Sequence, residues 1–164
     1  MERARALARL VEASPREVRA LVTILFGEDV ELRKRAADVA RRITEREPAV
    51  LAPFADELAG LLAELPVGEN RTRWHLGLVV PRVAVTREQR VRAARLMMLL
   101  EGDESNVVRC SAVEGMGTLA LADASLRDEA EEMVERFLRG ETLAMRSRAR
   151  QVRALLQRKY RLRA

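Results

Sequence analysis

Apolar residues recur along this chain at the three- and four-residue spacing of amphipathic helices, and capping signals divide them into segments. A Ser14–Glu17 capping box with Pro15 at the first helical position opens one segment, which Gly27 ends. A Thr86–Gln89 box opens another that ends at Gly102, and we expect Ser125–Asp128 to open a third that ends at Gly140. The pattern predicts a chain built from helices.

Prolines and glycines mark the remaining helix ends. Pro48 and Pro53 fit the first turns of a helix that Pro66 and Gly68 close. Residues 2–12 and 15–26 predict a helical hairpin in front of it, so that we expect about nine helices in all. The predicted fold class is therefore all-α.

A second pattern repeats at longer range. After each of four glycines come an acid, a few residues, an arginine and then a small or apolar run. The four arginines are 40, 36 and 37 residues apart: Arg33, Arg73, Arg109 and Arg146. A period of this length made of two helices is typical of an α-solenoid. We expect one domain over 1–164, with repeats 1–27, 28–67, 68–102 and 103–140 and a terminal helix over 141–162.

The repeated acid and arginine have a physical interpretation. The acid lies where the first turn of a helix exposes unpaired N–H groups and a partial positive charge. The arginine, one to two turns later, can bond to an acid or a carbonyl of the same or the next repeat. Because they precede the arginines, Leu32, Val108 and Met145 are candidates for the core between repeats.

The repeat resembles HEAT repeats, in which an acid is followed by a Val-Arg pair and alanines. The residues that carry the resemblance are Asp103, Val108, Arg109 and Ala112, and Glu28, Asp29, Leu32, Arg33, Ala36 and Ala37. Residues 47–54 also resemble the proline-bearing start of a HEAT helix. The chain departs from the pattern at 72–75, where bulky residues replace alanines, and at Pro81, which must end or kink its helix. The resemblance implies a superhelix of about four helical hairpins that binds macromolecules.

Composition narrows the class of protein further. The chain is 48% hydrophobic and 34% charged but only 3% aromatic, which favours a helical core and argues against disorder or a β-sandwich. Cys110 is the single cysteine, so an internal disulfide or a cysteine-based zinc site is excluded. The apolar runs are too short for a membrane span, and the first residues do not resemble a signal peptide. We therefore expect a cytoplasmic protein without membrane association.

Two constellations suggest chemistry but have simpler interpretations. Gly115–Ala120 fits the text of the dinucleotide fingerprint G-x-G-x-x-A, yet it lies where a helix is predicted and no βαβ unit surrounds it. His75 and Cys110 could meet across neighbouring repeats, but no further group supports a catalytic pair. We accordingly expect no catalytic residue, no cofactor or metal site, and no enzyme activity.

The net charge of +5 is unevenly distributed. Residues 1–100 carry 18 basic and 14 acidic residues, residues 101–140 carry 4 and 10, and residues 141–164 carry 8 and 1. The last segment places arginines around one helix: Arg146, Arg148, Arg150 and Arg153. One interpretation is that the acids at 128–135 neutralise these arginines. The other is that the arginines form a patch that binds phosphate or an acidic protein.

These observations predict a non-enzymatic module that binds another protein. Aromatic and arginine residues favour interface hot spots, so Arg71, Arg73, Trp74 and His75 form a candidate site, with the arginines of the last helix as a second one. The other interpretation of Trp74 is a bulky core residue. The alternative function is binding of a nucleic-acid backbone through the last helix, without glycosylase chemistry, since the chain has few aromatics.

Overall fold

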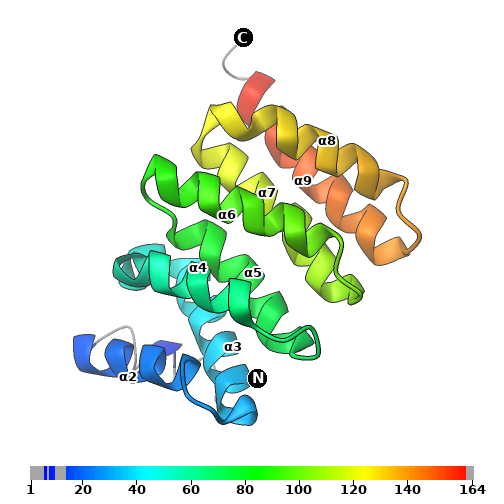
Figure 1. Ribbon diagram of the computed structural model, residues 1–164. Coiled ribbons are helices and arrows are strands. Elements are labelled where there is room, and N and C mark those ends of the chain that lie inside the picture. The colour runs from blue at the N-terminus through cyan, green and yellow to red at the C-terminus, as the bar shows by residue number, and fades with distance from the viewer. Residues whose placement is uncertain (1–5, 7, 10–13, 162–164) are drawn as a thin grey trace.

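The computed structural model describes residues 6, 8, 9 and 14–161, and in this part of the chain every regular element is a helix (Figure 1). The helix predicted over 2–12 lies outside the described residues apart from 6, 8 and 9, which are helical. The all-α prediction is thus confirmed for the described chain. The α-helices are α2 (Pro15–Leu25), α3 (Val30–Arg46), α4 (Ala55–Glu64), α5 (Asn70–Val83), α6 (Arg87–Glu101), α7 (Asn106–Ala122), α8 (Arg127–Leu138) and α9 (Leu143–Arg161), with 3₁₀ turns at η1 (Pro48–Val50), η2 (Ala52–Phe54) and η3 (Ala124–Leu126).

The helices form two layers. We call α3, α5, α7 and α9 the odd layer and α4, α6 and α8 the even layer; α2 packs on α3. Within the odd layer each helix packs extensively on the next, whereas α4 and α6 share a smaller contact and α6 and α8 pack very little on each other (Figure 1). The odd layer is therefore the more tightly packed of the two.

The core lies between the layers and along the odd layer. Val108 and Met145 are fully buried there, as predicted, but Leu32 is 48% exposed, so its assignment to the core was wrong. The reason is position: α3 is the first odd-layer helix of the described chain, and no earlier helix of that layer covers Leu32.

Side-chain caps are present at some helix starts and absent at others. The Thr86–Gln89 box is confirmed, since the side chains of both residues bond to each other's backbone N–H. Ser14 is the N-cap of α2 but its side chain caps no N–H. The predicted box at Ser125 is wrong, because Asp123 accepts from the N–H of Ser125 and caps η3, which leads into α8.

Glycines bring the odd-layer helices close together. A β-carbon on Gly77 would lie 2.5 Å from the hydroxyl oxygen of Ser111, and one on Gly115 would lie 2.9 Å from the carbonyl oxygen of Gly77. A β-carbon on Gly117 would overlap Val152 of α9. The fingerprint-like Gly115–Ala120 thus lies inside α7, where its glycines serve helix packing. Helix α5 itself continues through Pro81 and ends two residues later.

Candidate interaction surface

Two of the four periodic arginines connect their own helix to the residue that lies just before the next odd-layer helix. The guanidinium of Arg33 lies 3.2 Å from a carboxylate oxygen of Glu69, and that of Arg73 lies 2.6 Å from a carboxylate oxygen of Asp103. The Asp103 side chain is almost fully buried and also accepts from the N–H of Ser105 at 2.8 Å. These contacts confirm the predicted role of Arg33 and Arg73.

The other two repeated arginines bond to nearby carbonyls. Arg109 donates to the carbonyl of Glu101 at 3.1 Å, and Arg146 donates to the carbonyls of Gly140 and Glu141 at 2.7 and 3.1 Å. Both therefore fix the turn that precedes their own helix. Arg146, a candidate partner-binding residue, is half-buried and occupied by this structural role.

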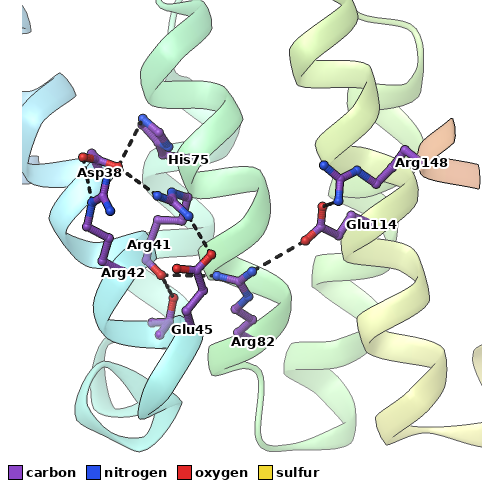
Figure 2. Close-up of polar contacts among 9 residues, drawn as sticks. Asp38, Arg41, Arg42, Glu45, His75, Arg82, Glu114 and Arg148 are labelled. Atoms are coloured by element: carbon purple, nitrogen blue, oxygen red, sulfur yellow. Dashed lines mark hydrogen bonds and ion pairs between the residues drawn. The ribbon is translucent and has the colours of Figure 1, made fainter. Parts of the chain in front are cut away.

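A polar network begins on the side of α3 that faces α5 (Figure 2). Asp38 accepts from Arg41 at 3.1 Å and from Arg42 at 3.0 Å, and Arg41 also donates to Glu45 at 2.6 Å. Burial alone would raise the pKa of Asp38, but the hydrogen bonds from Arg42 and Arg41 outweigh it and hold this pKa below its ordinary value. Asp38 is therefore ionised at neutral pH.

The network then crosses the whole odd layer. Arg82 of α5 donates to the carbonyl of Arg41 at 3.2 Å and lies 3.6 Å from Glu114 of α7. Glu114 in turn lies 2.9 Å from Arg148 of α9 (Figure 2). All four odd-layer helices thus contribute to one surface, which we call the odd-layer face.

His75 lies beneath this face and is buried. Its side chain is 7% exposed, its Nε2 lies 4.0 Å from Asp38 Oδ1, and its Nδ1 has no hydrogen-bond partner among the residues that the structure describes. Burial is the largest effect on the pKa of His75 and lowers it to about 4. The negative charge of Asp38 acts to raise this pKa, whereas the positive charges of Arg41 and Arg71 lower it further. The imidazole is therefore neutral at pH 7 and is a packing group.

Trp74 and Arg71 are the accessible part of the predicted hot spot. The Trp74 ring stacks on His75 with centroids 4.4 Å apart and an interplanar angle of 28°. Trp74 is half-buried against the core, and Arg71, three residues earlier, is on the same side of α5. Arg71 is exposed and makes no hydrogen bond or ion pair within the described chain. Within the described chain, an aromatic ring and an unpaired cation thus lie three residues apart on one side of α5.

The arginines of α9 do not form a single patch. Arg148 belongs to the odd-layer face through Glu114, whereas Arg153 lies 4.0 Å from Glu135 of α8. Arg150 is exposed and unpaired among the described residues. The helix therefore presents its cations in several directions.

Cys110 occupies the place on α7 that corresponds to Trp74 one repeat earlier. It is half-buried, and burial raises the pKa of its thiol above the ordinary value. No hydrogen bond or ring contact joins it to His75 in the described part of the chain.

Sequence reasoning missed every residue of this network except Arg148. Asp38 could have been found, since it stands three and four residues before arginines on a predicted helix. Arg82 and Glu114 are 32 residues apart, and no local spacing indicates that they meet.

The chain matches no known family model, no curated protein and no solved structure, so its function must be inferred from its own residues. None of the described helices is both long enough and apolar enough to cross a bilayer. Within the described residues, no three His, Cys, Asp or Glu side chains are grouped so that they could hold a metal ion.

Proposed function

We propose that this protein is a short HEAT-like α-solenoid without enzymatic activity, which binds a partner protein on its odd-layer face around Trp74 and Arg71. The observation that carries the proposal is the contrast between Arg71 and its neighbours. Arg41, Arg42, Arg82 and Arg148 are all paired with acids of the same face, whereas Arg71 is exposed, beside the half-buried Trp74, and unpaired among the described residues.

The packing of the layers supports the choice of face. In a two-layer stack, the layer whose helices lie closer together is on the concave side. The odd layer has the larger helix–helix contacts and the glycines that permit close approach, so it would be the inner layer of the proposed solenoid. A partner on that side can contact several helices at once.

The residues indicate the chemistry of the partner. The Trp74 ring offers apolar area at the low entropic cost of a stacked side chain, and the Arg71 guanidinium can bind a carboxylate in bidentate fashion. We infer that the partner presents an apolar side chain next to an aspartate or glutamate. Binding of a nucleic-acid backbone is the competing function, and it is weakened because Arg146, Arg148 and Arg153 have partners within the protein.

Affinity capture from a lysate of the cell of origin, with cross-linking, tests the proposal. We expect one protein to be retained by the wild type and lost with R71E and with W74A. Arg19→Glu is the matched control, because Arg19 is also exposed and its side chain is unpaired among the described residues, but it lies on α2. Equal retention by the wild type, R71E and W74A would refute the proposed site.

A second measurement addresses the competing function. Binding to duplex DNA or RNA of 20–40 base pairs is measured against salt concentration, where each neutralised phosphate contributes a slope of about −0.9 on duplex DNA. Tight binding with a steep slope that R71E leaves unchanged would favour the nucleic-acid function instead.

A further inference from the structure

Helix α9 is the last helix of the odd layer, and one of its sides is left uncovered (Figure 1). Within the described chain it packs chiefly on α7 and α8. Val152 marks the side that faces α7, because it packs on Gly117 of that helix. Ala154 follows Val152 by two residues, which is about 200° around the helix, so it points away from α7 and from the stack.

The uncovered side of α9 alternates small residues with arginines. Its members follow one another at intervals of three and four residues and are all exposed; we call them the α9 strip: Ser147, Arg150, Ala154, Arg158 and Arg161. Leu143, one turn before Ser147, is 75% exposed on the same side. A hollow of about 540 Å³ is lined by Ala154, Gln157, Arg158 and Arg161. The strip therefore offers guanidinium groups around small side chains.

The cations of the α9 strip have no acidic partner among the described residues. Arg150 and Arg158 make no hydrogen bond or ion pair there, and Arg161 donates to Gln157 of its own helix at 3.3 Å. Helix α9 itself contains no acidic residue. The acids of the neighbouring α8 are engaged elsewhere or make no ion pair with the strip: Glu131 pairs with Arg127, Glu132 with Arg136 and Glu135 with Arg153, and Asp128 pairs with no cation of α9. The strip is thus a surface of positive charge only.

Ala154 occupies the place at which a further odd-layer helix would pack. It follows Gly117 by 37 residues, the interval that also separates Arg109 from Arg146. Gly117 is the point where α9 packs on α7, and a β-carbon there would overlap Val152. A small side chain at this position allows the axes of two helices to approach closely. Ala154 keeps this property, although no helix of the described chain follows α9 in the layer.

We propose that the α9 strip binds an acidic helix of a partner protein. The helix packs over Ser147 and Ala154 as a further odd-layer helix would, and it places carboxylates against the arginines of the strip. Charge complementarity selects this occupant, because a second α9 would bring arginines against arginines. A nucleic-acid backbone fits less well, since the three arginines of the strip contact few phosphates and no aromatic side chain of the strip can stack on a base. The site is separate from the partner site at Trp74 and does not rest on it.

Binding of designed helical peptides to the full chain tests the proposal. The probe is a labelled peptide of about 20 residues, matched to the length of α9, in which alanines on one side of the helix are flanked by glutamates. The comparison peptide has lysine in place of each glutamate. In fluorescence anisotropy at low salt, we expect the glutamate peptide to bind one-to-one and the lysine peptide not to bind. Absence of binding by the glutamate peptide would overturn the proposal.

Charge reversal separates the strip from the net charge of the protein. R150E/R158E should weaken binding of the glutamate peptide by about tenfold or more, because two attractive contacts become repulsive. R16E/R19E on α2 changes the net charge by the same amount and should leave the affinity within about twofold. Equal losses in the two variants would show that the peptide responds to net charge alone, and the site would be refuted.

A substitution that keeps every charge tests the packing of the helix. Ala154→Phe fills the place where the partner helix approaches, and it should weaken the glutamate peptide by about tenfold. Ala20→Phe on α2 is the control, since Ala20 is also exposed on a helix, and it should bind like the wild type. Unchanged affinity in A154F would mean that no helix packs on the strip.

Duplex DNA of about 20–40 base pairs in the same assay distinguishes the two classes of ligand. Tighter binding of the duplex than of the glutamate peptide, lost in R150E/R158E, would assign the strip to nucleic acid and overturn the proposal. Far-ultraviolet circular dichroism confirms that each variant is folded.

Discussion

Replacing Gly115 by alanine should destabilise the protein, whereas the same replacement at Gly60 should stabilise it. Both glycines lie inside helices, Gly115 in α7 and Gly60 in α4. A β-carbon on Gly115 would lie 2.8 Å from Pro81 Cγ and 2.9 Å from the Gly77 carbonyl oxygen, but nothing lies within 4 Å of one on Gly60. The change in chemistry is identical, so only the surroundings differ.

The magnitude follows from two opposing effects. Alanine is favoured over glycine in a helix interior by about 1 kcal/mol. At Gly115 the new methyl group must separate α5 from α7, because one of the atoms it meets is backbone and cannot rotate away. Overpacking of this kind costs about 3 kcal/mol at the upper end of its usual range. We therefore expect G115A to lose about 2 kcal/mol and G60A to gain about 1 kcal/mol of unfolding free energy.

Urea unfolding followed by far-ultraviolet circular dichroism and by the fluorescence of Trp74, the single tryptophan, measures both variants. The corresponding shifts in Tm are a decrease of about 4–8 °C for G115A and an increase of about 2–4 °C for G60A. If G115A is as stable as the wild type, α5 and α7 do not approach as closely as the structure indicates, and the explanation of the glycine is wrong.

Three further predictions concern buried polar groups. Asp103→Asn should lower the free energy of unfolding in urea by about 3–5 kcal/mol, because it leaves the Arg73 guanidinium buried without its carboxylate. The control Asp56→Asn breaks the exposed Asp56–Arg92 pair and should cost less than about 1 kcal/mol. Similar losses in the two variants would contradict this account. The pKa of His75 is about 4 in the folded protein and 6.5 ordinarily, so the unfolded chain binds the proton first as the pH falls. The stability that the neutral imidazole provides is therefore fully present above pH 6.5 and is lost progressively as the pH falls to about 4. On this basis the wild type should lose on the order of 2 kcal/mol more than H75Q over that interval, and parallel pH profiles would disprove it. Finally, the raised pKa and half-burial of Cys110 should make its thiol react with Ellman's reagent more slowly in the folded protein than in urea, and equal rates would show that the thiol is freely accessible.

The sequence predicted the helices because capping and apolar spacing are local, and it predicted the contacts of Arg33 and Arg73 because arginines recur along the chain at similar intervals. The Thr86–Gln89 box involves residues three apart, and an arginine such as Arg73 recurs five to seven residues after each of four glycines. Leu32 was misplaced because its environment depends on whether an odd-layer helix precedes α3, and a periodic pattern does not contain this information. The HEAT-like solenoid and the protein-binding function stay predictions.

The candidate site was predicted only in part, for a different reason. Trp74 and Arg71 were noticed as residue types, but their relation to His75 and to the acids of α3 depends on how α3 and α5 are placed side by side. The pairing of Glu114 with both Arg82 and Arg148 requires three helices to be in register. Such contacts have no counterpart in the spacing of residues along the chain.

The packing of each odd-layer helix on its immediate neighbours has a consequence for how the native protein opens. In the described chain, α7 packs on α5, α6, α8 and α9, whereas α2 packs chiefly on α3. Local opening should therefore start at the two ends of the stack and reach α7 last, so that amide hydrogens of α7 exchange most slowly with solvent. Trp74 lies on α5, next to this most protected helix, so a partner held there would stay bound while the outer helices fray and re-form.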